Sequence, residues 1–180
     1  MLRPEESCRY IWLDKRRCND YIGVVTKSLQ DEIKQTRPFS SLEEEACLAL
    51  QLTADRLSRR GVEMLKQHGL SPAQYNTLRI LRGAGAAGLA CSEIGERMIN
   101  RDPDITRMLD RLERRDLVQR SREQQDRRVI TTRITPEALD LLKRLDRPMV
   151  DFNKELLGDL GESRLKSLIR LLDAVREIAG

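Results

Sequence analysis

The sequence predicts a mainly α-helical chain with one small β-hairpin, and a change of apolar periodicity carries this prediction. Between Ile105 and Leu112 apolar residues recur every three or four positions, which is typical of one face of a helix. After Leu117 the period changes to two. The β-branched run from Val129 to Thr132 then faces residues 118–122 across a polar tip, which predicts two paired strands.

The helix with the apolar stripe is expected to begin at Pro103. Asp102 is a suitable N-cap, and proline is favoured at the first helical position because the N–H that it lacks would be unpaired there. The face opposite the stripe is polar and rich in arginine. Its residues are Thr106, Arg107, Asp110, Arg111 and Arg114.

Positive charge gathers in this part of the chain. Residues 97–133 contain eleven arginines, no lysine and seven acidic residues, so their surplus of four equals the formal charge of +4 of the whole chain. Arginine favours forked hydrogen bonds to phosphate or to guanine edges. The pattern predicts contact with double-stranded DNA, and the alternative that charge alone leaves open is a solvated surface.

The residues upstream extend the arrangement. Ser71 and Gln74 predict a capping box, with Pro72 at the first position of a helix that runs through Leu81. A glycine-rich loop at 83–88 and a short helix near 92–98 follow. Helix, short helix, turn, longer helix and hairpin together predict a winged helix-turn-helix, in which the second helix of the pair enters the major groove.

Several segments, in this order, resemble the MarR family (multiple antibiotic resistance regulators) of transcription factors. They are LSPAQYNTLRIL, CSEIGERM, ITRMLDRLERRDLV and DRRVITTRITPEAL, and the resemblance covers roughly residues 43–179. The sequence departs from the family pattern at Ile99 and Asn100, where a glycine and an apolar residue are frequent, and at Asp116, where glycine is common.

The resemblance implies which residues contact DNA. The helix from Pro103 to Arg111 would lie in the major groove, with Thr106 and Arg107 near base edges and Arg111 or Arg114 near phosphates. The family's Asp-x-Arg wing pattern corresponds to Asp126 and Arg128, which implies that Arg128 enters the minor groove and Asp126 orients it, with Arg127 at a phosphate. The predicted DNA-binding set is Pro103, Asp104, Thr106, Arg107, Asp110, Arg111, Arg114, Asp126, Arg127 and Arg128.

Amphipathic helices are predicted at both ends of the domain. One is expected from Glu43 to Lys66, and the other follows Thr135 and Pro136, with a bend or interruption at Pro148. Their apolar stripes leave two interpretations open: packing inside one chain, or the homodimer that the resemblance implies. The predicted dimerisation residues are Leu50, Leu57, Leu165, Leu168, Leu172 and Val175.

These observations predict the domain organisation. Residues 42–179 form a MarR-type domain, with dimerisation helices at 42–68 and 136–179 and the winged helix-turn-helix at 71–135. The resemblance does not explain residues 1–41, which could be an extra helix, a mobile arm or a leader. Ser41 is placed to cap the long helix that follows.

Composition narrows the class of protein. A chain of 180 residues fits one domain, and with aromatic residues at 3% leucine packing must supply most of its core. No apolar run is long enough for a membrane span or a signal peptide, so a cytoplasmic location is expected.

The cysteines predict neither zinc nor disulfides. Cys8, Cys18, Cys47 and Cys91 form no Cys-x-x-Cys pair, and the single histidine leaves too few ligands for structural zinc. The stretch LEEEACLAL around Cys47 is faintly similar to the one that carries the sensing cysteine of peroxide-responsive family members, but the tyrosine expected three to four residues later is missing. Cys47 is therefore a redox candidate, against the default of a buried or half-buried small hydrophobe.

No pattern of residues points to catalysis or to a cofactor. The glycines at 83, 85 and 88 lack the following Lys-Ser/Thr of a phosphate loop, and no nucleophile has a histidine partner. The residues predict a DNA-binding protein, and the resemblance implies a dimeric repressor, which we expect to respond to a small molecule bound between the terminal helices and the DNA-binding part. The alternatives are a protein-binding winged helix, whose affinity would lack the steep salt dependence of phosphate contacts, and a thiol-based sensor of the same family.

Overall fold

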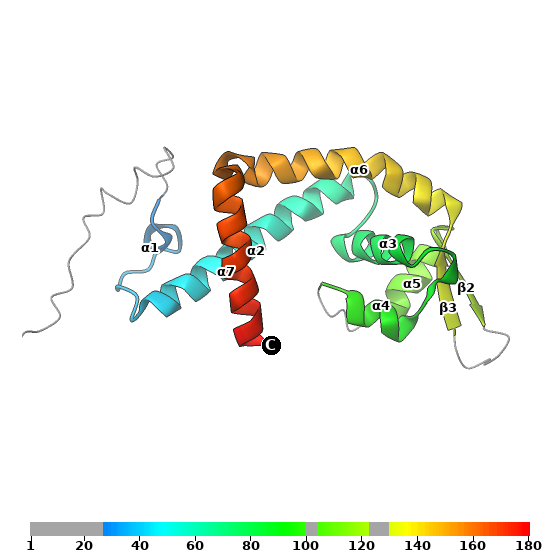
Figure 1. Ribbon diagram of the computed structural model, residues 1–180, viewed down its shortest axis with the longest axis horizontal. Coiled ribbons are helices and arrows are strands. Elements are labelled where there is room, and N and C mark those ends of the chain that lie inside the picture. The colour runs from blue at the N-terminus through cyan, green and yellow to red at the C-terminus, as the bar shows by residue number, and fades with distance from the viewer. Residues whose placement is uncertain (1–26, 100–103, 123–129) are drawn as a thin grey trace, which may run out of the picture. The chain divides into compact units, whose positions relative to one another are not determined.

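The computed structural model describes residues 27–99, 104–122 and 130–180, whose elements are shown in Figure 1. The chain divides into two compact units, Met1–Gln51 and Leu52–Gly180. The described part of the first unit holds α1 (Leu29–Glu32) and the beginning of α2 (Leu42–Lys66). Ser41 caps α2 as predicted, because its hydroxyl oxygen accepts the N–H of Glu44 at 3.2 Å.

Helix α3 (Pro72–Ala84) begins with the predicted capping box. The Ser71 hydroxyl accepts the Gln74 N–H at 3.2 Å, and the Gln74 side-chain oxygen accepts the Ser71 N–H at 3.0 Å. Two of the N–H groups left unpaired at the helix start are thereby satisfied. The buried residues of α3 are Tyr75, Thr77, Leu78 and Leu81.

A turn leads from α3 into a strand that the sequence analysis did not predict. The one-turn helix η2 (Gly85–Ala87) follows α3, and Gly83 lies in the last turn of α3, so the glycine-rich loop is shorter than expected. Strand β1 (Leu89–Ala90) comes next. Gly88 has a φ of +70°, and a Cβ added there would stand 2.6 Å from the carbonyl oxygen of Thr132. Glycine is therefore required where the turn enters the sheet.

The predicted hairpin is confirmed and forms most of a small sheet. Strands β2 (Val118–Arg122) and β3 (Ile130–Ile134) pair antiparallel, with Val118 opposite Ile134 and Arg122 opposite Ile130. Strand β1 pairs with the other edge of β3, which gives the order β1-β3-β2. A two-residue strand is too short to show the alternation by which strands are recognised, which explains why β1 escaped prediction.

Two helices complete the helix-turn-helix. Helix α4 (Cys91–Arg97) lies close to the predicted 92–98 range, and its N-terminal Glu93 accepts the Ala90 N–H at 2.7 Å. Helix α5 (Ile105–Glu113) follows. The expected start at Pro103 is wrong: Asp104 is the N-cap, and Asp102 and Pro103 lie outside the described residues. Both aspartates are good N-caps, so residue type alone could not choose between them.

Thr135 starts α6 (Pro136–Leu157) as predicted and also joins it to the turn between α5 and β2. Its hydroxyl oxygen accepts the Ala138 N–H at 3.2 Å, and the same hydroxyl donates to the carbonyl of Asp116 at 2.7 Å. Pro148 lies inside α6 without ending it, so of the predicted bend or interruption the interruption is wrong, since a proline removes one helical hydrogen bond and a long helix can continue past it. The bend stays a prediction. The helices η3 (Gly158–Leu160) and α7 (Gly161–Ala179) follow.

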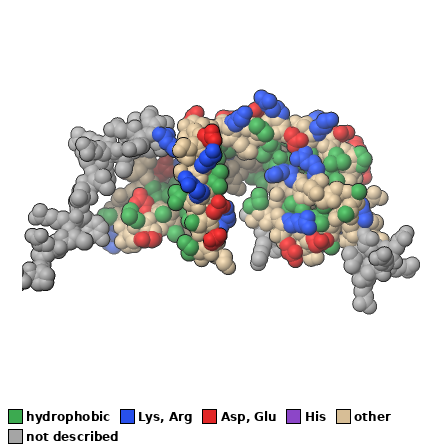
Figure 2. Space-filling view, in the orientation of Figure 1, with side chains coloured by type: hydrophobic (Ala, Val, Ile, Leu, Met, Phe, Trp, Pro, Cys, Tyr) green, Lys and Arg blue, Asp and Glu red, His purple; other side chains and the backbone are tan. Residues whose placement is uncertain are grey.

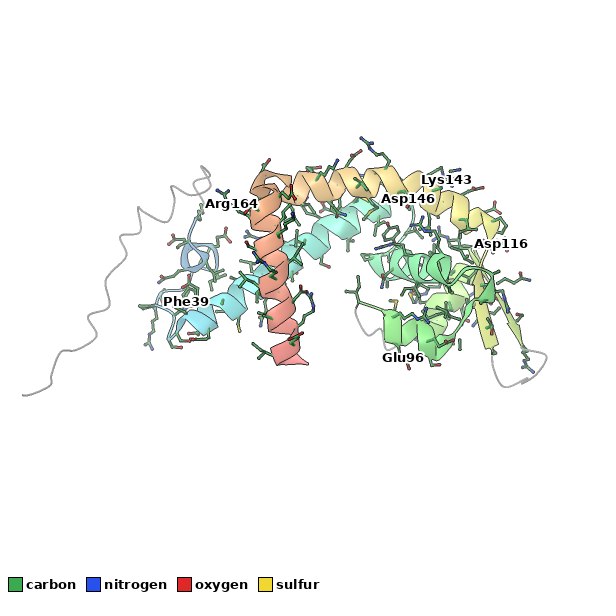
Figure 3. All side chains as sticks on the ribbon, viewed as in Figure 1. Phe39, Glu96, Asp116, Lys143, Asp146 and Arg164 are labelled. Atoms are coloured by element: carbon green, nitrogen blue, oxygen red, sulfur yellow. The ribbon has the colours of Figure 1, made fainter. Side chains whose placement is uncertain are left out.

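Helix α6 is tied to α3 by an ion pair. The Arg82 guanidinium donates to both carboxylate oxygens of Asp146, which is labelled in Figure 3, at 2.9 and 3.0 Å. Both side chains are partly exposed, so the pair orients the two helices more than it stabilises the fold.

The hydrophobic core belongs to the winged helix-turn-helix and the first half of α6. Among the described residues, the buried hydrophobic side chains run from Leu65 to Leu145, and ten of the sixteen are leucines, as the low aromatic content predicted. Helix α7 has no buried residue, and α2 has Leu65 alone. Within the described ranges, no helix combines the length and the apolarity that crossing a bilayer requires.

We predict that Gly88→Ala lowers the free energy of unfolding by about 2–4 kcal/mol, because the new Cβ would meet a backbone oxygen at a positive φ. Gly83→Ala is the matched control. An added Cβ there meets nothing within 4 Å, so alanine inside α3 should raise stability by about 0.5–1 kcal/mol. Urea unfolding followed by circular dichroism measures both variants, and equal stabilities would contradict the role of Gly88.

Candidate nucleic-acid interface

The two faces of α5 are as the sequence predicts. Met108, Leu109 and Leu112 are buried in the core. On the other side Thr106, Arg107 and Arg111 are exposed, and so is Arg114, the residue that ends the helix. The inner face therefore fixes the helix on the domain, and the outer face presents hydroxyl and guanidinium groups to solvent.

Asp104 begins α5 and contacts Arg107 twice. The Arg107 N–H donates to Oδ1 of Asp104 at 3.4 Å, and Arg107 Nη1 lies 3.3 Å from Oδ2. A carboxylate at this position also interacts favourably with the positive end of the helix dipole. Asp104, one of the predicted DNA-binding residues, thus caps α5 and contacts the Arg107 side chain.

Asp110 is held inside the protein's own structure by Arg120 of β2. Arg120 Nη2 lies 2.6 Å from Oδ1 of Asp110 and 2.5 Å from Oε2 of Glu113. Arg120 Nε donates to the same Glu113 oxygen at 2.9 Å, and the Arg120 backbone N–H donates to Oε1 of Glu113 at 3.2 Å. We call these three residues the Arg120 cluster. It links strand β2 of the hairpin to α5.

The hydrogen bonds within the Arg120 cluster favour the charged forms of Arg120 and Glu113. The hydrogen bond from Arg120 holds the pKa of Glu113 below its usual value. The hydrogen bonds to Glu113 and Asp110 in turn raise the pKa of Arg120. The cluster carries two negative charges and one positive charge, so Arg120 does not add to the positive surface that the sequence predicted.

Other arginines counted in the sequence also serve the fold. Arg115 Nη1 donates to the Gly69 carbonyl at 2.7 Å, which ties the end of α5 to the residues before α3. Arg133 donates to the Ala86 carbonyl at 3.1 Å and to the Ser121 hydroxyl at 2.7 Å. The clustered arginines therefore fall into two groups. Some bind backbone carbonyls or carboxylates of the chain itself, and others, such as Arg107 and Arg111, are exposed to solvent.

Sequence reasoning missed the role of Arg120, although a signal was present. Side chains alternate between the two faces of a strand, so Arg120 lies on the same face as the buried Val118. Alternation alone therefore indicated a half-buried arginine. The positions of its acceptors on α5 depend on tertiary packing and could not be read from the strand.

The wing tip contains three residues of the predicted set. Asp126, Arg127 and Arg128 lie outside the described residues, as does Pro103 of the helix start. Arg122 and Ile130 form the last described pair below the tip, and both are exposed. The assignment of Arg128 to a minor groove stays a prediction.

None of the predicted dimerisation residues is buried in the chain. Leu50, Leu57 and Val175 are exposed, and Leu165, Leu168 and Leu172 are partly exposed. None of the six belongs to the hydrophobic core. Figure 2 shows hydrophobic side chains along α7, interleaved with charged ones. Among the described residues these stripes therefore lie outside the hydrophobic core, and the choice between packing within one chain and a homodimer stays a prediction.

The cysteines and the cavities complete the description. Cys47 is exposed on α2, so its expected burial is wrong, and Cys91 is partly buried at the first turn of α4. Within the described residues no three His, Cys, Asp or Glu side chains lie close enough together to hold a metal. A recess of about 130 Å³ lies between α3 and α5, lined by Ser71, Ala73, Gln74, Asp104, Arg107, Met108 and Arg111.

A helix-turn-helix whose second helix exposes arginines beside a small antiparallel sheet defines a winged helix-turn-helix protein. Residues 70–130 match the model of the MarR family. The crystal structure of a MarR transcription factor from Planctomyces limnophilus is 42% identical, with a TM-score of 0.60, over 76% of this chain and 99% of that chain. This chain belongs to the MarR family.

Two further similarities bear on the family's activity. The HTH-type transcriptional repressor MdtR of Bacillus subtilis (strain 168) is 37% identical over 90 residues, which are 50% of this chain and 57% of MdtR. The matched region thus spans little more than half of that relative. The transcriptional repressor CouR, bound to a 23-mer DNA duplex, is 26% identical with a TM-score of 0.68, over 79% of this chain and 99% of that chain.

We predict that Arg120→Met lowers the free energy of unfolding by about 1–2 kcal/mol at neutral pH, because two half-buried carboxylates lose their partner. Arg147→Met is the control, since its pair with Asp151 is largely exposed and should contribute less than about 0.5 kcal/mol.

The pH dependence gives a second check on Arg120→Met. The pKa of Glu113 is depressed in the folded state, so its contribution is complete above the usual value of 4.5 and is lost as pH falls through the lower folded value. The stability difference between wild type and Arg120→Met should shrink in acid. A difference that stays constant from neutral pH to acid would contradict the ion-pair assignment.

Proposed function

We propose that the protein is a sequence-specific regulator of transcription that binds double-stranded DNA as a homodimeric, ligand-responsive repressor. The observation that carries the proposal is the outer face of α5, where Thr106, Arg107 and Arg111 are exposed on a helix whose inner face is buried. Membership of the MarR family, the name of MdtR and the DNA duplex bound to CouR support it.

In this proposal α5 lies in the major groove. Thr106 and Arg107 in its first turn contact base edges, because recognition helices contact bases through their N-terminal residues. Arg111 and Arg114, further along, neutralise phosphates. Asp110 acts on DNA indirectly, since Arg120 holds its carboxylate.

The proposed domain organisation follows the sequence analysis. Residues 42–179 form the MarR-type domain, with the winged helix-turn-helix at 71–135 and dimerisation helices at 42–68 and 136–179. Residues 1–41 form an extension. The wing tip, with Asp126, Arg127 and Arg128, contacts the minor groove and its phosphates.

The homodimer is proposed because the terminal helices expose apolar surface. Helix α7 has no buried residue, although leucines and isoleucines recur along it, and an apolar stripe of this length favours association. Two copies related by a two-fold axis place two recognition helices on two half-sites of a palindrome. Following the sequence analysis, we place the small-molecule effector between the terminal helices and the winged helix-turn-helix, because the 130 Å³ recess beside α5 is smaller than the roughly 300–1,000 Å³ of typical small-molecule sites and the recess of about 530 Å³ at residues 33–44 lies outside the MarR-type domain for most of its lining.

Binding of the purified protein to duplex DNA tests the function. Fluorescence anisotropy compares a duplex from its own upstream region with an unrelated duplex at two salt concentrations. We expect tighter binding to the upstream duplex, and affinity for both should fall steeply as salt rises because counterions are released from phosphates. Absence of DNA binding at low salt, with the protein folded, would instead favour a protein-binding winged helix.

We predict that Arg107→Ala costs about 1–3 kcal/mol of binding free energy at its preferred sequence and relaxes the choice of one base pair, because a forked contact to a base is lost. Arg147→Ala on the exposed side of α6 is the control and should change neither. Equal weakening on every duplex would assign Arg107 to a phosphate.

We predict that the double variant Leu168→Glu and Leu172→Glu converts the dimer to a monomer and abolishes tight operator binding, because a dimer interface cannot bury unpaired carboxylates. Arg170→Glu adds a carboxylate to α7 at an exposed position outside the stripe and should leave the dimer intact. Light scattering after size exclusion measures the mass, and circular dichroism checks the fold. A dimeric double variant would place the interface elsewhere.

A further inference from the structure

Asp104 uses its two carboxylate oxygens for different contacts with one residue. Oδ1 accepts the backbone N–H of Arg107 and so caps α5, and Oδ2 lies 3.3 Å from Nη1 of the Arg107 side chain. The backbone contact sets where the helix begins. The side-chain contact sets where the guanidinium lies relative to that beginning.

The side-chain contact matters little for stability. The Arg107 side chain is 76% exposed and that of Asp104 is 46% exposed, and water screens such a pair strongly. Its larger effect is on the freedom of Arg107, whose long side chain otherwise samples many rotamers. A side chain restrained before binding loses less conformational entropy when it meets DNA.

The pair also favours one kind of DNA contact over another. A carboxylate 3.3 Å from the guanidinium offsets its charge and repels a phosphate, which makes Arg107 a poorer backbone ligand than the exposed Arg111 one turn later. The other N–H groups of the planar guanidinium remain available for a forked contact. Guanine offers the matching pair of acceptors, O6 and N7, in the major groove.

We propose that Asp104 is a positioning residue for DNA recognition: it holds the Arg107 guanidinium for a guanine edge and thereby sets base preference at one position of the binding site. This inference rests on the proposed function. In this proposal Asp104 does more than cap α5, and guanine is the base that Arg107 selects.

The test separates the cap from the positioning. Asp104→Asn keeps a side-chain oxygen for the Arg107 N–H, and asparagine caps helices as well as aspartate does, but the charge beside the guanidinium is lost. Asp104→Ala removes both contacts. Glu96→Gln, an exposed residue of α4 (Figure 3), removes one negative charge elsewhere in the same domain and controls for general electrostatics.

The measurement uses the full chain and duplexes that wild type selects from a random pool. Each base pair of the selected site is then varied in turn. For Asp104→Asn we expect preference for guanine at one position to fall about three- to tenfold, with an unchanged melting temperature. Glu96→Gln should keep the wild-type preference. Adding Arg107→Ala to Asp104→Asn should cost no more specificity than Arg107→Ala alone.

Each outcome has a distinct meaning. If wild type binds all duplexes equally, the proposed sequence-specific function fails. If wild type discriminates and Asp104→Asn keeps the full guanine preference, the positioning role is overturned while the proposed function stands. A loss of preference in Asp104→Ala alone, together with a lower melting temperature, would reduce Asp104 to a helix cap and also overturn the inference.

Discussion

The ion pairs of Arg120 with Asp110 and Glu113 hold the two parts of the candidate DNA-binding surface together. Arg120 stands on β2 and its two partners stand on α5, so the cluster sets the hairpin relative to the helix. The chain between them is short, and Asp116 within it takes a positive φ of 55°, where the family commonly has glycine. Because the polar contacts are half-buried, water competes with them less than it does with the exposed pairs of the terminal helices.

The separation of buried and exposed apolar surface explains how the domain is built. Core leucines fix α3, α4, α5 and the sheet against the first half of α6. Helix α7 contributes no buried residue to this core and α2 contributes Leu65 alone, so the apolar side chains of these two helices remain largely exposed. In a two-fold dimer that surface would be covered, and the winged helix-turn-helix would keep its fold because its core does not depend on the terminal stripes.

The arginines divide into side chains that hold the fold and side chains that face solvent. Arg115, Arg120 and Arg133 bind carbonyls, a hydroxyl or carboxylates of the chain itself. The exposed arginines of α5 differ among themselves, since Arg107 has an aspartate beside it. Local pairing thus decides whether a guanidinium is suited to a phosphate, to a base or to the protein's own structure.

The sequence by itself determined the fold class, the order of the longer helices and the hairpin, the capping box at Ser71 and the buried face of α5. These features depend on interactions between near neighbours, because caps act over three residues and apolar periodicity reports the face of a helix or strand. Tertiary structure alone decided that β1 pairs with β3 and that Arg120 reaches Asp110 and Glu113. Each of these outcomes depends on which groups packing brings together, and a count of residue types cannot show where a charge finds its partner.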